Sequence, residues 1–311
     1  MSSRILATSP LVGRALAELG ARFPELRLAT FRSPEWNAAL PEAEALVVVL
    51  SDALTEADLE AAPRLRAIGT FSVGVNHLPV AACRARGIAV VNTPEVLTDA
   101  TADLALALLL ALTRRVAEGE ALVRSQRWQG WEPDQLLGAS LAGKGCGILG
   151  SGPIGLAFAR RAWALGMAPA FWDREGRGGE VDFGPGRAPR LALADLLARS
   201  RVLSIHCPLT DQTHHLLDRR ALEHLPEGAV ILNTARGGIL EEDAALDLLA
   251  SGRLGGVGLD VYEGEPGLNP RWLQAPRTVL LPHLGSATVE TREAMARLLC
   301  DGLAAALSTP R

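Results

Sequence analysis

Positive charge is scarce in this sequence compared with what a nucleic-acid-binding protein needs. The 311 residues include 31 Lys and Arg against 35 Asp and Glu, which gives a formal net charge of −4. Without a basic excess, binding to a phosphate backbone would release few counterions and gain little free energy. We therefore exclude nucleic acid as a partner.

Cysteine pairs and long apolar runs are also missing. The four cysteines form no C-x-x-C pair, so the sequence indicates neither a zinc knuckle nor a disulfide framework. The apolar stretch 104–112 is far shorter than the ~20 residues that span a bilayer, and residues 1–8 form a β-like run without an apolar export segment. We expect a cytoplasmic chain with no membrane partner. The cysteines are Cys83, Cys146, Cys207 and Cys300.

Metal-binding motifs are not found either. The six histidines include no H-E-x-x-H helix. The side chains of the one adjacent pair, His214 and His215, are expected to point apart. We predict no metal site and no metal-dependent catalysis.

What the sequence does contain is a regular alternation of short β-like runs with helical patterns. Its length favours two domains, and the alternation predicts parallel sheets covered by helices, hence an α/β fold. An apolar helix over 98–123 separates two such series, and a final helix over 288–307 is expected to pack back on the first. The predicted domains are a discontinuous substrate domain, 1–97 with 287–311, and a dinucleotide-binding domain, 98–286.

A glycine motif follows one β-like run and opens a helix. In Gly150-x-Gly152-x-x-Gly155 the first glycine permits a tight turn, the second lets the backbone approach a pyrophosphate, and the third lets the helix pack closely on the strand. Pro153 suits the first helical turn. The free N–H groups at such a helix start attract phosphate.

The following strand pattern ends in an acid, which bears on the choice of dinucleotide. Asp173 stands where a carboxylate can accept hydrogen bonds from the ribose hydroxyls and repel a 2′-phosphate. We therefore favour NAD(H). NADP(H) stays open, because the neighbouring Arg174 could receive such a phosphate.

Three later β-like runs are each followed by a charged or titratable residue: Arg236, Glu265 and His283. Reduction of a 2-keto acid needs a cation for the carboxylate, a proton donor for the carbonyl oxygen, and an anion that favours the protonated donor. A guanidinium recognises a carboxylate through a planar fork, and histidine exchanges protons near neutral pH. Each residue read alone is more often structural, but together they fit this chemistry.

Seven strings, in order between about residues 70 and 290, carry a resemblance to a known family. The sequence resembles the D-isomer-specific 2-hydroxyacid dehydrogenases. The strings are Ser72-Val-Gly-Val-Asn-His77, Val91-Asn-Thr-Pro-Glu-Val-Leu-Thr-Asp-Ala-Thr-Ala-Asp103, Gly147-Ile-Leu-Gly-Ser-Gly-Pro-Ile-Gly155, His206-Cys-Pro-Leu-Thr210, Asn233-Thr-Ala-Arg-Gly-Gly238, Leu259-Asp-Val-Tyr-Glu-Gly-Glu-Pro266 and Pro282-His-Leu-Gly-Ser-Ala-Thr288.

The resemblance implies two Rossmann-like domains with the active site in the cleft between them. It assigns Arg236 to substrate orientation, His283 to acid–base work and Glu265 to pairing with the histidine. Val73 and Gly74 would offer backbone N–H groups to the substrate carboxylate. The cofactor contacts that it implies, besides the glycine motif and Asp173, are Ile154, Cys207, Pro208, Thr213, Ala235 and Asp260.

Within the family, the likeness is greatest to glyoxylate/hydroxypyruvate reductases, which are homodimers. The strings 96–104 and Trp128-x-x-Trp131-x-Pro133 fit that branch. Trp131 is the candidate for a side chain that reaches the substrate pocket of the partner subunit. A dimer contact without a substrate role is the equally weighted alternative.

Other functions stay open at this point. The chain could act on another D-2-hydroxy acid, of the D-lactate or D-3-phosphoglycerate type. It could also be an NAD-sensing interaction protein, since some relatives of this family recruit partners as NAD-dependent dimers. The Arg/Glu/His set does not exclude the sensing role, but the lack of flanking disordered tails in the sequence disfavours it.

Overall fold

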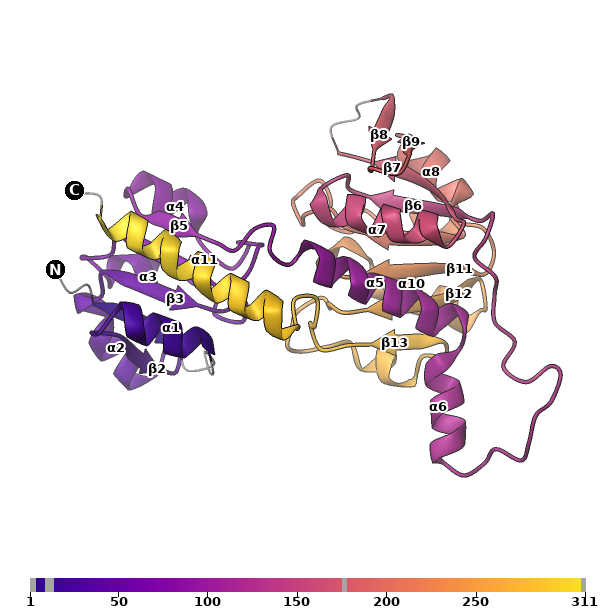
Figure 1. The fold of residues 1–311 in the computed structure, drawn as a ribbon, viewed down its shortest axis with the longest axis horizontal. Helices are drawn as coiled ribbons and strands as arrows, with labels where there is room; N and C mark the ends of the chain where they lie inside the picture. The colour runs from indigo at the N-terminus through magenta and orange to yellow at the C-terminus, as the bar shows by residue number, and fades with distance from the viewer. Residues whose placement is uncertain (1–3, 9–13, 175–177, 309–311) are drawn as a thin grey trace. The chain divides into compact units, whose positions relative to one another are not determined.

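The computed structural model describes residues 4–8, 14–174 and 178–308. These residues divide into two compact units, one from 1–97 with 286–311 and the other from 98–285. Each unit is built on a parallel β-sheet with helices packed against it (Figure 1). The predicted α/β class with parallel sheets is confirmed.

The first unit holds a five-stranded sheet in the order β2-β1-β3-β4-β5, with every pairing parallel. Helix α11 covers one face of this sheet (Figure 1). A Cβ at Gly69 of β4 would lie only 2.6 Å from Cδ1 of Leu299 on α11, so glycine is what lets this helix lie close to the strand. The strands are β1 (Ile5–Thr8), β2 (Arg27–Ala29), β3 (Ala45–Val48), β4 (Ala67–Thr70) and β5 (Ala89–Val91); the helices are α1 (Arg14–Arg22), α2 (Pro34–Ala39), η1 (Leu40–Glu42), α3 (Glu56–Glu60), α4 (Val80–Ala85) and α11 (Val289–Ser308).

The second unit holds a six-stranded parallel sheet in the order β13-β12-β11-β10-β6-β7. The central strands β10 and β11 are buried along their whole length, as their continuous apolar runs predict. The strands are β6 (Gly145–Leu149), β7 (Ala168–Trp172), β10 (Val202–Ile205), β11 (Ala229–Asn233), β12 (Leu254–Leu259) and β13 (Thr278–Leu280), with an antiparallel hairpin of β8 (Glu180–Asp182) and β9 (Arg187–Pro189). The helices are α5 (Thr98–Thr113), α6 (Val116–Arg124), α7 (Pro153–Ala164), α8 (Leu193–Arg199), α9 (Arg219–Glu223), η2 (Gly237–Ile239), α10 (Glu242–Ala250) and η3 (Pro270–Gln274).

The apolar segment after residue 97 is two helices, so the expected single helix over 98–123 is wrong. Helix α5 packs beside α7 and against β11 and β12, where Gly258 leaves room for Leu108 and Leu112. The break falls at Arg115, whose backbone is left-handed with φ 53°. Its guanidinium donates to Glu118 at 2.7 Å, which fixes the turn into α6.

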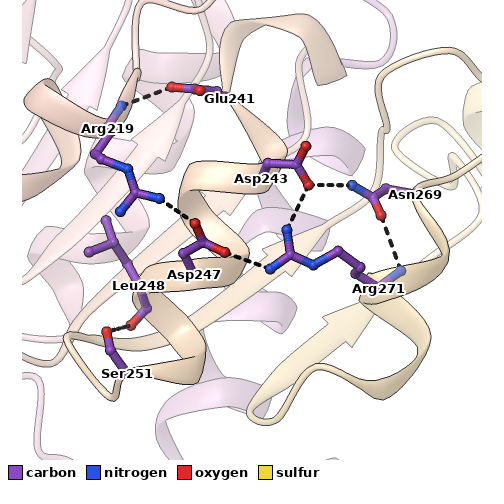
Figure 2. Close-up of polar contacts among 8 residues, drawn as sticks. All are labelled: Arg219, Glu241, Asp243, Asp247, Leu248, Ser251, Asn269 and Arg271. Carbon is purple, nitrogen blue, oxygen red and sulfur yellow. Dashed lines mark hydrogen bonds and ion pairs between the residues drawn. The ribbon is translucent and has the colours of Figure 1, made fainter.

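An exposed network of charges ties η3 to α10 (Figure 2). Arg271 donates to Oδ1 of Asp243 at 2.8 Å and to Oδ1 of Asp247 at 2.6 Å. Asn269 donates to Asp243 at 3.0 Å, and Arg219 pairs with Asp247 from the side of α9. Exposed pairs contribute little singly, but this network fixes the segment between β12 and β13 to α10.

No helix within the described residues has the length and apolar character needed to cross a membrane.

Candidate active site

The glycine motif forms a tight turn between β6 and α7. Gly150 has φ 103°, and a Cβ there would lie 2.9 Å from the backbone N of Cys207. A Cβ at Gly155 would lie 2.1 Å from the carbonyl oxygen of Gly150, so helix and strand meet at van der Waals contact. Gly152 caps α7 and Pro153 opens it. Nothing lies within 4 Å of a Cβ placed on Gly152, which leaves the helix N-terminus open to a phosphate.

Asp173 follows β7 and accepts hydrogen bonds from the glycine loop. Ser151 donates to it from its backbone N and from Oγ, both at 2.7 Å. Nε of Arg190 donates to Oδ2 at 2.6 Å. Burial would raise the pKa of the Asp173 carboxyl, but the bonds from Ser151 and Arg190 outweigh it and lower that pKa. The carboxylate therefore stays ionised at neutral pH.

The other expected cofactor contacts lie on the same unit. Ile154 is half-buried in α7. Cys207 follows β10, and burial raises the pKa of its thiol to about 12, so the thiol is unreactive. Thr213 is buried and donates to the carbonyl of Pro208 at 2.6 Å, which closes the loop between them. Ala235 lies after β11, and contact of these residues with a cofactor stays a prediction.

The predicted triad comes together at one edge of the six-stranded sheet. Nδ1 of His283, after β13, lies 2.8 Å from Oε2 of Glu265, after β12. Burial would raise the pKa of Glu265, but the bonds from His283 and from the Tyr262 backbone N lower it. Arg236, after β11, has its pKa lowered by burial and partly restored by the charge of Glu265. A half-buried cation, a carboxylate and an imidazole thus share one electrostatic environment.

Asp260 holds the backbone that carries the histidine. Its Oδ1 accepts from the N of Leu284 at 2.6 Å and its Oδ2 from the N of Gly285 at 2.8 Å. Its carbonyl accepts from the N of His283 at 2.9 Å. Asp260 is fully buried, and this burial raises the pKa of its carboxyl. Its expected place near the nicotinamide stays a prediction, whereas its support of His283 is a finding.

Asn233 supports the arginine in a similar way. Its Nδ2 donates to the carbonyl of Arg236 at 2.9 Å, and its Oδ1 accepts from the N of Ala235 at 3.0 Å. Gly237, which follows Arg236, has no room for a side chain, because a Cβ on it would lie 1.9 Å from the carbonyl carbon of Tyr262. The loop after β11 is therefore packed directly on the loop after β12.

Tyr262 joins that loop to the loop after β13. Its hydroxyl donates to the carbonyl of Leu281 at 2.9 Å, and its backbone N donates to Oε1 of Glu265 at 2.8 Å. The carboxylate of Glu265 is thus oriented by two bonds, one from Tyr262 and one from His283.

The structure adds four residues that the sequence argument did not assign: Ser151, Arg190, Asn233 and Tyr262. Ser151, Asn233 and Tyr262 lie inside the quoted family strings, and this position could have indicated that they belong to the site. Arg190 lies outside every string.

Val73 and Gly74 lie in the first unit, after β4. Asn92 donates to the carbonyl of Val73 at 2.8 Å, and Oγ of Ser72 donates to the carbonyl of Gly74 at 2.7 Å. Among the described residues, none accepts a hydrogen bond from the N–H of either residue. The expected donors are therefore available, and their contact with substrate stays a prediction.

Trp131 lies in the connection between α6 and β6. Its side chain is 82% exposed and that of Trp128 is 53% exposed. Neither contacts the triad within its own unit through any described interaction. A role at a partner subunit stays a prediction.

The expectation that His214 and His215 point apart is wrong. Their rings stack with centroids 4.0 Å apart, because His215 has a left-handed backbone with φ 47° that turns both rings to the same side. Nε2 of His215 lies 3.1 Å from the carboxylate of Glu263. The ligand atoms of these three residues lie within 4.8 Å of one another, so the prediction that the chain has no metal site stays untested.

Comparison with known proteins agrees with this arrangement. Residues 106–285 match the family described as D-isomer specific 2-hydroxyacid dehydrogenase, NAD binding domain. A glyoxylate reductase of Thermococcus litoralis is 41% identical over 269 residues, which cover 85% of this chain and 80% of the relative. A glyoxylate/hydroxypyruvate reductase A of Arabidopsis thaliana is 38% identical over 308 residues, 98% of this chain and 96% of the relative.

A solved structure has the same fold along nearly the whole chain. It is an NADPH-dependent glyoxylate/hydroxypyruvate reductase of Sinorhizobium meliloti in complex with NADP and malonate, similar with a TM-score of 0.88 and 32% identity. The match covers 99% of this chain and 95% of that one.

Proposed function

Because the chain belongs to the D-isomer-specific 2-hydroxyacid dehydrogenase family, we propose that it reduces a small 2-keto acid, of the glyoxylate or hydroxypyruvate type, with NADH or NADPH. The observation that carries the proposal is the 2.8 Å contact between Nδ1 of His283 and Oε2 of Glu265, whose carboxylate interacts electrostatically with the half-buried Arg236. This set supplies a proton donor, its counter-ion and a cation for the substrate.

The glycine loop and Asp173 fit a dinucleotide. Gly152 leaves the start of α7 open, and Asp173 is ionised and borders the loop through Ser151. These residues would hold the pyrophosphate and the ribose hydroxyls. The nicotinamide, when bound, supplies the hydride that adds to C2 of the keto acid.

The protein's part is to orient the substrate and to move one proton. Arg236 binds the carboxylate or the carbonyl oxygen of the substrate through its planar fork. As the hydride adds to C2, His283 gives a proton from Nε2 to the carbonyl oxygen, and the product is the 2-hydroxy acid. Glu265 accepts from Nδ1, which fixes the orientation of the ring. In the reverse direction His283 takes the proton back.

The N–H groups of Val73 and Gly74 complete the proposal as donors to the substrate carboxylate. Hydrogen bonds from backbone N–H groups to a carboxylate need no side chain, which is why an apolar valine and a glycine can serve here.

The test is the oxidation of NADH and NADPH, followed by absorbance, with glyoxylate, hydroxypyruvate, pyruvate and phenylpyruvate. Fast turnover with glyoxylate or hydroxypyruvate is the expected result. Turnover with a bulkier keto acid alone would move the chain to another branch, such as the D-lactate type. Binding of NADH without turnover of any keto acid would favour the NAD-sensing role.

We also propose that the chain works as a homodimer through residues 116–137. None of α6 is buried, and α6 with the connection after it extends from the rest of its unit (Figure 1). Large apolar side chains are exposed throughout this segment, and such a patch marks a contact surface. They are Val116, Val123, Trp128, Trp131 and Leu137. Light scattering at micromolar concentration should give the mass of two chains, and a monomer would refute the assignment.

A cytoplasmic setting is part of the same proposal. Each of the four cysteines is free and buried, which fits a reducing compartment.

A further inference from the structure

The ribose end of the dinucleotide site contains an ion pair. Asp173 and Arg190 are mostly buried, with side chains 21% and 18% exposed, and Nε of Arg190 lies 2.6 Å from Oδ2 of Asp173. The carboxylate that faces the ribose hydroxyls in the proposed function is therefore already paired with a cation. An unpaired carboxylate at this place repels a 2′-phosphate, but here a positive charge in contact offsets that repulsion.

The backbone places Arg190 beside the end of β7 with little freedom. Arg190 makes a parallel bridge with Phe171 of β7. Its N donates to the carbonyl of Gly179 at 2.8 Å, and the N of Leu191 donates to the carbonyl of Phe171 at 2.8 Å. The hairpin of β8 and β9 thus returns the chain to the edge strand, and the guanidinium comes to lie on the carboxylate.

Within the described part of the chain, the Arg190 guanidinium has donors left for a further ligand. Nε is engaged by Asp173, and Nη1 has only a long 3.5 Å contact with the carbonyl of Gly178. Among the residues that the structure describes, no other polar group contacts either Nη atom. A phosphate ester carries about two negative charges at neutral pH, and guanidinium forks are the preferred partners of such groups.

We propose that Arg190 makes this site accept NADPH as well as NADH, by neutralising Asp173 and donating from its Nη atoms to the 2′-phosphate. The inference rests on the proposed function only in that the chain binds a nicotinamide dinucleotide. Asp173 serves the free hydroxyls of NADH, and Arg190 serves the phosphate of NADPH. Asp173 alone would favour NADH, whereas Asp173 paired with Arg190 favours the use of both NADH and NADPH.

A purely structural role for Arg190 makes a different prediction. If the ion pair only ties the hairpin to β7, its loss should weaken the binding of both dinucleotides to the same degree. The ratio of the two affinities, measured without substrate, therefore separates the two roles.

The experiment is calorimetric titration of NAD⁺ and NADP⁺ into the full chain and its variants. Wild type should bind NADP⁺ within about tenfold of NAD⁺. Arg190→Leu should weaken NADP⁺ binding by about 10- to 100-fold, as expected for lost charge-assisted hydrogen bonds, and NAD⁺ binding by less than about threefold. Arg190→Lys, which keeps the charge but not the fork, should fall between the two.

Arg187→Leu is the matched control, because Arg187 lies on the same hairpin but its side chain is 69% exposed. Its ion pair with Glu180 is long, at 3.9 Å. It should leave both affinities unchanged. Adding Asp173→Asn to Arg190→Leu should restore part of the NADP⁺ affinity, because it removes the charge that Arg190 neutralised.

Equal loss of both dinucleotides in Arg190→Leu, or unchanged NADP⁺ binding, would overturn the inference. A wild-type chain that binds NAD⁺ but not NADP⁺ would overturn it and leave the proposed function intact. A chain that binds neither would overturn both.

Discussion

The loop that carries His283 and the segment 116–137 belong to the same unit but are held in opposite ways. Asp260 accepts three backbone hydrogen bonds from residues 283–285 and is fully buried. In the segment 116–137, no residue of α6 is buried and Trp131 is 82% exposed. The catalytic loop is thus stabilised within one chain, whereas the exposed segment needs a surface from outside it. Changes in the first should affect chemistry and folding, and changes in the second should affect assembly.

The largest effect is expected from His283→Ala. Loss of the proton donor should lower kcat by ~10²–10⁴-fold, the usual contribution of a general acid. The glycine loop follows β6 and His283 follows β13, with three strands of the sheet between them, so NADH affinity measured by fluorescence should change little. Near-normal kcat would refute the assignment of His283.

The next effect is expected from Asp260→Asn. The amide nitrogen of asparagine cannot accept, so one of the two backbone N–H groups, of Leu284 or Gly285, would lose its partner. Urea unfolding should show a loss of about 1–3 kcal/mol, together with a lower kcat. Asp134→Asn, in the exposed segment, is the control and should change neither quantity. Equal stability of the two variants would contradict the support role of Asp260.

A smaller effect is expected from pH. The pKa of Glu265 in the folded chain lies below its ordinary value of 4.5. Its ion pair therefore stabilises the fold fully above that value, and the stabilisation is lost as the pH falls through the lowered pKa. Urea unfolding between pH 7 and pH 3 should thus show a shallower acid dependence for Glu265→Gln than for wild type. Glu132→Gln, in the exposed segment, should show the same acid dependence of unfolding as wild type. An identical acid dependence for all three proteins would refute the contribution of the Glu265 ion pair to stability.

The smallest effect on the single chain is expected from Trp131→Ala. Its unfolding free energy should change by less than about 0.5 kcal/mol, because the side chain is exposed, while dimer dissociation measured by sedimentation should increase. Trp163→Ala, a half-exposed tryptophan on α7, should leave the dimer unchanged. A raised KM for the keto acid in Trp131→Ala would favour contact with the partner's substrate pocket, and unchanged dissociation would exclude Trp131 from the interface.

The meeting of the three triad residues could be predicted from the sequence. Arg236, Glu265 and His283 each follow a buried strand of a parallel sheet, and the carboxyl ends of such strands meet at one edge. Their proximity could therefore be expected from strand order and from the family strings. The parallel sheets followed from the alternation of elements in the same way.

The failures have local causes. The break at Arg115 and the stacking of His214 on His215 both depend on a left-handed backbone at a residue other than glycine, which no periodic pattern reveals. Arg190 was missed because a hairpin, not a repeating strand–helix unit, brings it to Asp173. Strand order predicts which strand ends lie close together, but it does not predict which strand a hairpin inserted between them packs against.

The packing of α11 on Gly69 has a consequence for synthesis on the ribosome. Residues 98–285 must be made before the helix that covers the first sheet. At about 5–20 residues per second, this delay is roughly 10–40 s. During that time the six-stranded unit, which is continuous in sequence, can fold as it emerges. Until α11 is made, the face of the first sheet that it covers stays exposed. The nascent chain should therefore depend most on chaperones before α11 appears.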